Sequence, residues 1–474
     1  MWTKWPRNLL ALTILVGVYS IVTPIEASAS KHVVCYFGTW STYRPSPGKF
    51  DVENIDPFLC THLVYAFLGI EENGDVRIID PYLDLEDNSG RGNIKKFNSL
   101  KLKNPTLKTL AAIGGWNEGS KKFSIVAADA EKRARFVNGV VKLIQRHGFD
   151  GIDLDWEYPG QRHSLDNKDQ ENFITLLKEL KEGLQPFSYI LSAAVGSAEF
   201  SARISYDIPK VVEYLDLINV MSYDLHGSWD EEVGINAPLY GRSNETKEQK
   251  ELNVDAIAKY WIGAGAPKEK LVLGVPFYGR TFTLASADNH NLGAPHIGRG
   301  IAGPYSREPG VLGYNELCEK MQQEAWTVEW ESEQQVPYAY KDRQWVGYEN
   351  TRSIELKAQY VVEHNLAGVM IWSLESDDFL GKCGEGRNPL LHTINRALFG
   401  TDTPTGLTDS PKDDASDSLN TYTCTADVGF VRDPHDCSKF YYCDSGSTFR
   451  FNCPTGLSFD YASSSCNYAE LVKC

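Results

Sequence analysis

Three acidic residues stand two positions apart in the segment FDGIDLDWEYPG, which spans residues 149–160: Asp153, Asp155 and Glu157. Because successive side chains of a β-strand point to opposite faces, these three carboxylates are expected to share one face and lie close together. Apolar residues alternate with them and are expected to pack against helices: Ile152, Leu154 and Trp156. Crowding of like charges raises the pKa of at least one carboxyl group, so Glu157 can keep its proton near neutral pH and act as a general acid.

Two other interpretations of this cluster fit less well. An EF-hand calcium loop needs a glycine at its sixth position and a glutamate at its twelfth, but counting from Asp153 these positions hold Tyr158 and Ser164. A solvated acidic patch is disfavoured by the interleaved apolar residues. A carboxylate cluster that is costly to bury therefore indicates a catalytic site.

The elements that must position these residues alternate between strand and helix patterns. Apolar, β-rich runs occur at residues 32–37, 62–70, 107–113, 149–154, 189–195, 215–221, 271–277 and 367–373. Apolar stripes at helical spacing lie between several of them, for example from Phe136 to Ile144 and from Phe173 to Leu184. Eight strand–helix units within residues 30–400 predict the α/β class and a (β/α)8 TIM barrel, with a small α+β insertion at about residues 279–350 that walls one side of a cleft.

Residues with distinctive chemistry follow the ends of different predicted strands. They are Gly114, Gly115 and Trp116 after the third strand, Glu157 after the fourth, Tyr223 and Asp224 after the sixth, and Trp372 in the eighth. Active sites of such barrels lie at the rim formed by the carboxyl ends of the strands. We therefore expect these residues to meet at one rim.

The regions outside the barrel have different compositions. Residues 1–29 resemble a secretory signal peptide, with a basic start, an apolar run at residues 9–22 and a small-residue cleavage site, Ala27-Ser28-Ala29. Residues 401–423 are rich in Thr, Ser, Asp and Pro and are predicted to be a flexible linker. Residues 424–474 hold six of the ten cysteines, which predicts a small disulfide-rich β module.

The cysteines and the charge limit the compartment and the partners. Ten cysteines fit an oxidising compartment, and in the body of the chain we expect the disulfides Cys35–Cys60 and Cys318–Cys383. The sequon at Asn244 predicts an exposed, glycosylated loop. A net charge of −16 argues against nucleic acid or an anionic membrane as partner. We expect a secreted, extracellular monomer without a membrane anchor.

The string D-x-x-D-x-D-x-E from Asp150 to Glu157 resembles the signature of family 18 glycoside hydrolases, the chitinases. Four further segments resemble that family in the expected order: AAIGGWNEGS at 111–120, MSYD at 221–224, GVPFYGRTF at 274–282 and GVMIWSLESDDF at 368–379. The six-cysteine tail, with FYYC at 440–443, is similar to the peritrophin-A type chitin-binding domain of arthropods. The resemblance implies an insect-type chitinase that acts on chitin and chitin oligosaccharides.

The resemblance also implies roles for the rim residues. Glu157 corresponds to the general acid/base, Asp155 to the carboxylate that orients the acetamido group of the substrate, and Asp153 to its buried partner. Tyr223 and Asp224 match positions that contact the same group. The implied reaction is endo-acting hydrolysis with retention, in which the substrate's own acetamide is the nucleophile and an oxazolinium ion forms, with no metal or cofactor. Asp150 stands three residues before Asp153, so its side chain should point to the opposite face of the strand, and it is expected to be structural.

Sugar-binding residues are implied by the same comparison. In the barrel they are Trp372, Trp116, Trp229, Trp40, Tyr278, Arg280 and Met221. In the tail the candidate aromatics are Tyr441, Tyr442, Phe459 and Tyr461, and the implied disulfides are Cys424–Cys443, Cys437–Cys474 and Cys453–Cys466. With so small a core, about half of the tail aromatics must pack inward instead.

The alternative function is a catalytically silent chitin-binding lectin of the same family. Such proteins usually lose the catalytic glutamate, whereas this chain keeps Glu157, Asp155, Tyr223 and Asp224. Two positions depart from the family pattern. Glu118 stands where an aromatic residue is common, and Glu375 replaces a common aspartate.

Overall fold

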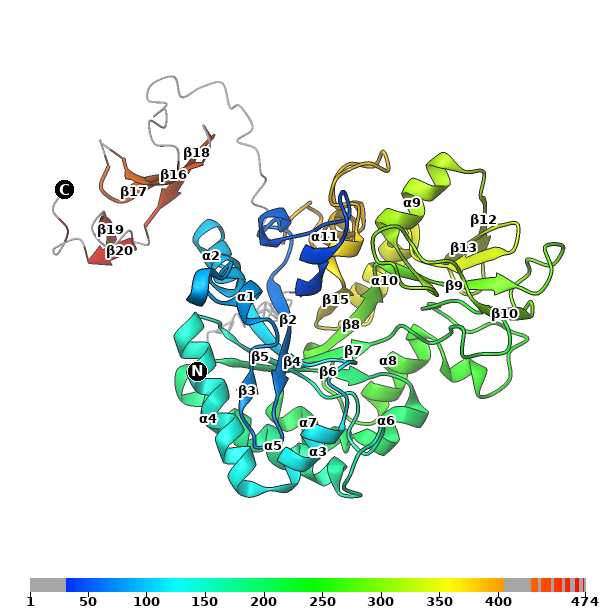
Figure 1. Cartoon of the computed structure of the whole chain (residues 1–474), viewed down its shortest axis with the longest axis horizontal. Helices are drawn as coiled ribbons and strands as arrows, with labels where there is room; N and C mark the ends of the chain where they lie inside the picture. Colours follow the sequence, from blue (N-terminus) through cyan, green and yellow to red (C-terminus); the bar gives the residue numbers. More distant parts are fainter. Residues whose placement is uncertain are drawn as a thin grey trace, which may run out of the picture. The chain divides into compact units, whose positions relative to one another are not determined.

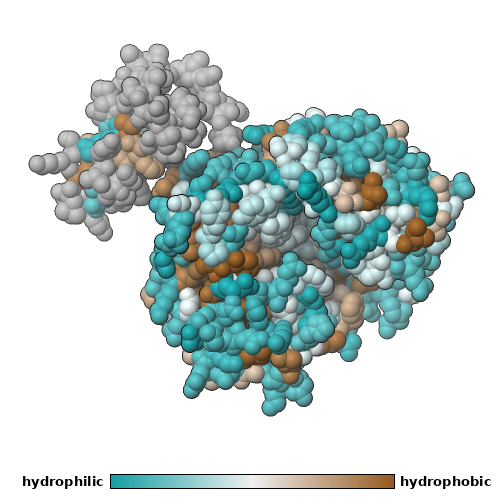
Figure 2. Space-filling model, in the orientation of Figure 1, coloured by the Kyte–Doolittle hydropathy of each residue, from teal (hydrophilic) through white to brown (hydrophobic). Residues whose placement is uncertain are grey.

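The computed structural model describes residues 31–404, 428–433, 436–444, 447–453, 457–460, 465–468 and 472. The chain divides into two compact units, residues 1–408 and 409–474, and each is described by itself. The predicted signal peptide and most of the predicted linker lie outside the described residues. Within the described ranges, no helix combines the length and apolarity that crossing a bilayer demands. Figure 2 shows that one face of the larger unit is mostly hydrophilic, with small hydrophobic patches.

The larger unit is built on a closed barrel of eight parallel strands (Figure 1). The strands are β1 (His32–Gly38), β2 (His62–Ile70), β4 (Lys108–Gly114), β5 (Gly151–Asp155), β6 (Ile190–Gly196), β7 (Leu217–Met221), β8 (Leu271–Pro276) and β15 (Gly368–Trp372). They follow the order β1-β15-β8-β7-β6-β5-β4-β2, and β2 pairs with β1 to close the ring. The short β3 (Val76–Arg77) runs antiparallel to β2. The predicted TIM barrel is therefore confirmed.

Helices surround the barrel: α1 (Pro81–Asp84), α2 (Asn93–Lys103), α3 (Lys121–Ala128), α4 (Ala130–His147), α5 (Asp169–Leu184), α6 (Glu199–Ser205), α7 (Ile208–Tyr214), α8 (Val254–Gly263), α10 (Thr351–Glu363) and α11 (Pro389–Phe399). Helix α4 shows how the sequence sets such an element. Asp129 accepts backbone N–H bonds at its start, and Gly148 ends it in the left-handed conformation at φ 76°. The predicted stripe from Phe136 to Ile144 packs into the core between helices and barrel.

The predicted insertion is a second, antiparallel sheet. Its strands are β9 (Tyr278–Leu284), β10 (His296–Arg299), β11 (Val311–Gly313), β12 (Thr327–Glu331), β13 (Val336–Lys341) and β14 (Gln344–Gly347), with the helix α9 (Tyr314–Gln323). The order is β10-β9-β14-β13-β12, and β11 also pairs with β9. Strand β9 begins two residues after barrel strand β8 ends. This connection brings one edge of the insertion directly to the barrel rim.

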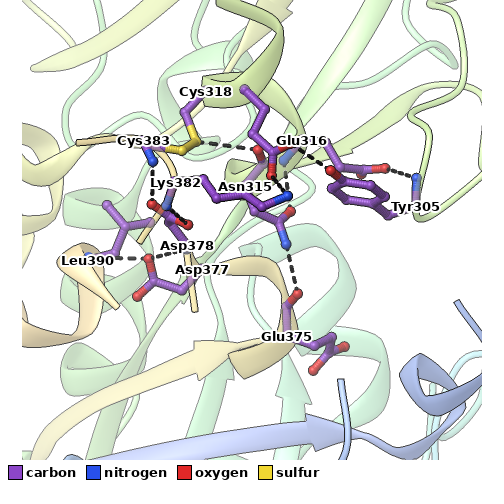
Figure 3. Close-up of a disulfide and its surroundings, with 11 residues drawn as sticks. Tyr305, Asn315, Glu316, Cys318, Glu375, Asp377, Asp378, Lys382, Cys383 and Leu390 are labelled. Atoms are coloured by element: carbon purple, nitrogen blue, oxygen red, sulfur yellow. Dashed lines mark hydrogen bonds and ion pairs between the residues drawn. A yellow bond between two sulfur atoms is a disulfide. The ribbon is translucent and has the colours of Figure 1, made fainter. Parts of the chain in front are cut away.

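Two disulfides lie in the larger unit, as expected. Cys35–Cys60 joins β1 to the residues before β2. Cys318–Cys383 joins α9 of the insertion to the loop after β15 (Figure 3). The loop is further ordered by Asp378, whose carboxylate accepts the backbone N–H groups of Lys382 and Cys383 at 2.9 and 2.7 Å. The Cys318–Cys383 disulfide therefore links the insertion to a barrel loop near the end of β15.

The smaller unit contains β16 (Val428–Arg432), β17 (Lys439–Asp444), β18 (Ser447–Asn452), β19 (Leu457–Asp460) and β20 (Ser465–Tyr468), in antiparallel sheets of three and two strands. Tyr441 is buried and its hydroxyl donates to Asp433 at 2.9 Å. Phe459 is also buried and stacks on Phe440. Both side chains are therefore buried within the described part of the module, and their role in sugar binding stays a prediction.

The remaining predictions for the tail are not tested. The side chain of Tyr442 and all of Tyr461 lie outside the described residues. Cys437 and Cys453 are disulfide-bonded. At least one cysteine of each pairing Cys424–Cys443, Cys437–Cys474 and Cys453–Cys466 has a side chain outside the described part of the chain, so the pairings stay predictions.

Candidate active site

The three carboxylates of the signature lie together at the carboxyl end of β5. Asp153, Asp155 and Glu157 are 0%, 3% and 7% exposed, so all are nearly excluded from solvent. Asp155 is the last residue of β5, and Glu157 follows directly in the connecting loop. Asp150 lies before β5 begins, where it accepts hydrogen bonds from Thr109 and Lys101. Asp150 therefore has structural partners at the start of the strand, as expected for a side chain on the face opposite to the other three.

Asp153 is held by donors from three other barrel strands. Tyr36 on β1 donates to one oxygen at 2.7 Å, and Ser192 on β6 and Asn219 on β7 donate to the other at 2.6 and 3.0 Å. Burial raises the pKa of Asp153, and these donors oppose that increase by stabilising the charged form. These partners could not be recognised from the sequence, because they stand in strands without a recognisable motif.

Asp155 has a different environment. Its Oδ1 atom is buried and has no hydrogen-bond partner among the described residues. Burial raises the pKa of Asp155 well above its usual range, and the neighbouring charges of Glu157 and Asp153 raise it further. A buried acceptor without a donor is costly, and this oxygen is free to accept a further hydrogen bond.

Glu157 has the pKa of a general acid. Its pKa is raised from 4.5 to about 7, chiefly by burial. Asp224 raises it further, whereas the hydrogen bond from Tyr158 and the positive charge of Arg162 lower it. We expected this increase in the pKa to come from crowding by acidic neighbours. Removal from water is the larger cause, because a carboxylate loses more hydration free energy on burial than nearby charges add.

Asp224 is fixed by the edge of the insertion. The hydroxyl of Tyr278 and Nε of Arg280, both on β9, donate to its Oδ1 at 2.6 and 2.7 Å. Nη2 of Arg280 lies 2.7 Å from its Oδ2, which completes a bidentate ion pair. The backbone of Asp224 has φ 57°, a left-handed conformation that aims its side chain at β9. The structure therefore brings Asp224, Tyr278 and Arg280 together.

A cluster of aromatic rings lies beside the carboxylates, because Tyr36, which donates to Asp153, is part of it. The ring of Trp372, at the end of β15, lies 5.5 Å from Tyr36, 5.6 Å from Phe67 and 6.0 Å from Trp40, measured between centroids. Tyr223 is buried nearby, and its hydroxyl lies 3.7 Å from the sulfur of Met370. Phe67 was missed by sequence reasoning, since an aromatic residue in a barrel strand usually belongs to the core.

Three tryptophans of the predicted set are exposed, namely Trp116, Trp229 and Trp40, at 60%, 57% and 43%. Two of these rings have an arginine guanidinium above one face. The guanidinium carbon of Arg162 lies 3.4 Å from the ring centre of Trp116, and that of Arg280 lies 5.0 Å from the ring centre of Trp229. Large exposed indole rings are suited to stacking on sugar faces. Met221 is half-buried at the end of β7.

The other singled-out positions lie outside the carboxylate cluster. Glu118 is paired with Arg77 and Lys122. Glu375 is buried, accepts a hydrogen bond from the Gly38 backbone and interacts with Arg44. Both therefore have structural partners within the protein. Asn244 is exposed, as an acceptor for glycosylation must be.

Comparison with known proteins agrees with this geometry. Residues 32–377 match the family "Glycosyl hydrolases family 18", and residues 424–474 match the "Chitin binding Peritrophin-A domain". The endochitinase of Manduca sexta is 38% identical over 82% of this chain and 71% of its own length. The crystal structure of the Ostrinia furnacalis group IV chitinase in complex with allosamidin is 51% identical, with a TM-score of 0.76 over 78% of this chain and 98% of that one.

A third relative, human YKL-39, is described as a pseudo-chitinase with retained chitooligosaccharide binding. It is 40% identical over 78% of this chain and 99% of that chain, with a TM-score of 0.72. The chain belongs to family 18 of the glycosyl hydrolases and carries a C-terminal peritrophin-A domain. It is thus a glycoside hydrolase of the chitinase family, as its signature predicted.

Proposed function

We propose that this chain is a secreted, monomeric endo-chitinase that hydrolyses β-1,4-linked N-acetylglucosamine polymer with retention of configuration. The observation that carries the proposal is the contrast between two adjacent buried carboxyl groups. Glu157 has a pKa of about 7, suited to donating a proton, and Asp155 has an oxygen without a partner. An acetamide N–H is the donor that such an oxygen lacks.

In the proposed reaction Glu157 protonates the glycosidic oxygen as the bond to the leaving sugar breaks. The acetamide carbonyl oxygen of the retained sugar attacks the anomeric carbon and forms an oxazolinium ion. The carboxyl oxygen of Asp155 accepts a hydrogen bond from the acetamide N–H, which holds the carbonyl oxygen in line for its attack. Glu157 then takes a proton from the water that opens the ring. The two displacements at the same carbon together give retention.

The other rim residues would complete the substrate site. Asp153 would support Asp155 from below, and Tyr223 and Asp224 would contact the acetamido group. Trp372 would form the floor beneath the distorted sugar, with Met221, Tyr278 and Arg280 lining the cleft. Cellulose lacks the acetamide that this reaction requires, so the proposed substrate class is chitin. The allosamidin complex of the Ostrinia relative and the C-terminal chitin-binding domain support that choice.

The competing function is chitin binding without hydrolysis, as in YKL-39. The variant Glu157→Gln separates the two, because it removes the proton donor and nearly keeps the shape of the side chain. We expect kcat on a fluorogenic chitotrioside to fall by about 10²–10⁴-fold, the usual contribution of a general acid, while oligosaccharide binding persists. The matched control Glu199→Gln, at a half-buried residue that begins α6 and pairs with Arg203, should leave kcat unchanged. Full turnover by Glu157→Gln would remove Glu157 from this role, and an inactive wild-type chain would favour the lectin.

Secretion and processing form a separate part of the proposal. The two disulfides of the larger unit are consistent with an oxidising compartment. Mass spectrometry of the protein from culture medium should show an N-terminus near residue 30 and a glycan at Asn244. Retention of the full chain inside the cells would contradict secretion.

A further inference from the structure

Arg162 lies in the loop between β5 and α5 and contacts two parts of the candidate site. Its guanidinium lies 3.4 Å from the ring centre of Trp116, so it covers one face of the indole. The same group donates from Nη1 to the backbone oxygen of Glu157 at 3.1 Å and from Nη2 to that of Trp116 at 3.0 Å. One planar cation therefore joins the exposed tryptophan to the backbone of the general acid.

The loop is shaped to hold this arrangement. Arg162 and His163 have φ values of 51° and 66°, a left-handed conformation that costs free energy in residues other than glycine. Such backbone persists where surrounding contacts compensate for it, and the bonds of Arg162 are contacts of that kind. The loop also borders a hollow of about 490 Å³, whose lining includes Arg162, Leu165 and Ile204.

We propose that Arg162 is a positioning residue for the glycosidase reaction, which holds the indole of Trp116 as a platform for an outer sugar of a long substrate and fixes that ring relative to the backbone of Glu157. This inference rests on the proposed function. Trp116 is 60% exposed, so the ring face opposite Arg162 is open to a sugar. Without the guanidinium, an exposed indole would sample several rotamers, and sugar binding would have to restrict them.

The second exposed tryptophan supports the same interpretation. Arg280 lies 5.0 Å from the ring of Trp229 while it forms its bidentate pair with Asp224. Two arginines thus each contact an exposed indole and a member of the candidate site. Arg162 differs because it contacts the backbone of Glu157 itself and is close enough to lower the pKa of that residue.

Several groups face Glu157 and must be considered in any effect on pH dependence. They come from β5, from the loop after it, from the residues after α6 and from the loop after β7: Asp155, Tyr158, Arg162, Tyr206, Tyr223 and Asp224. Arg162 is the cation in this set. Removal of its charge should therefore raise the pKa of Glu157 and move the alkaline limb of kcat/KM to higher pH.

Two substitutions in the full-length protein separate stacking from charge. Arg162→Gln removes both, and Arg162→Lys keeps the positive charge but loses the planar group that stacks on indole. We expect both variants to raise KM for chitohexaose about 3- to 10-fold, whereas KM for a fluorogenic chitobioside, whose leaving group is a small aglycon, stays near the wild-type value. The alkaline limb should shift upward by roughly half a pH unit in Arg162→Gln and stay in place in Arg162→Lys.

The control is Arg203→Gln, because Arg203 is exposed on α6 and ion-paired with Glu199. Thermal unfolding of each variant checks that it is folded. The proposal is overturned if both Arg162 variants are folded and keep the wild-type KM for chitohexaose. A lower KM, which would mean that Arg162 competes with the sugar for the ring, also overturns it. If the wild-type chain hydrolyses nothing, the proposed function fails, and chitohexaose affinity of Arg162→Gln then tests the platform by itself.

Discussion

Two neighbouring carboxyl groups on one strand have different partners, and this difference gives each a separate chemistry. Asp153 accepts three hydrogen bonds from side chains, and the Oδ1 atom of Asp155 accepts none from the described residues. Glu157, two residues further on, holds its proton mainly because it is buried. Local surroundings, more than residue type, therefore separate a structural anchor, an acceptor that awaits a donor and an acid.

The pH dependence of catalysis should report this acid. Because Glu157 has a pKa of about 7, it is protonated below that pH and loses its proton above it. A general acid is active only when protonated, so kcat/KM should fall about tenfold per pH unit above roughly pH 7. Hydrolysis of a soluble fluorogenic chitotrioside at constant ionic strength measures this limb. Activity that stays constant up to pH 9 in a protein that remains folded would contradict the assignment.

The sequence revealed only part of this cluster. The three carboxylates were predictable because they stand at strand spacing within one segment. Tyr36, Ser192 and Asn219 were not, since each comes from a different barrel strand and shows no local pattern. Arg162 was missed for another reason: an arginine in a polar loop is usually solvated. Contacts between distant segments depend on closure of the barrel, which no local motif encodes.

Among the elements, the junction of β4 and β5 has no room for an added side chain. A Cβ atom at Gly114 would lie 2.0 Å from the backbone oxygen of Asp155, and φ at this glycine is 124°. The next residue, Gly115, donates its N–H to the same oxygen at 2.9 Å. The pair of glycines therefore lets the end of β4 contact the end of β5 directly, where any side chain would push the strands apart.

The variant Gly114→Ala tests this close approach. We expect a loss of about 2 kcal/mol or more in the free energy of unfolding, together with a lower kcat, because the new methyl group must displace Asp155 or strain the backbone. Gly263→Ala is the matched control, since its Cβ would meet nothing within 4 Å at the end of α8. Thermal unfolding and chitotrioside turnover measure both effects. Equal behaviour of the two variants would show that β4 has room to move.

The order of the elements was predicted more accurately than the residues at which they begin and end. All eight barrel strands were found, because buried parallel strands appear as continuous apolar runs. Their starts were less accurate: the predicted runs at residues 149–154 and 215–221 correspond to strands that begin at Gly151 and Leu217. The insertion was recognised only by its length. Its edge strands are short and partly exposed, so they lack the continuous pattern that marked the barrel.

At the scale of the whole molecule, each of the two units has a separate role in the proposed function. The match to the solved Ostrinia chitinase covers 78% of this chain and 98% of the Ostrinia chain. That enzyme is therefore similar in length to the larger unit. The peritrophin-A match is confined to residues 424–474. An autonomous catalytic unit joined to a binding module would raise the local concentration of enzyme on an insoluble polymer.

Truncation after residue 404 tests this separation. The shortened chain should retain kcat and KM on soluble chitotrioside within about twofold, because every residue of the candidate active site remains. Its adsorption to insoluble chitin should weaken by about tenfold or more, since the cleft alone then has to hold the polymer. Depletion from solution by chitin particles, compared with depletion by cellulose, measures the adsorption. Equal losses of adsorption and soluble turnover would mean that the module stabilises the barrel, whereas unchanged adsorption would assign polymer binding to the aromatic rim of the barrel itself.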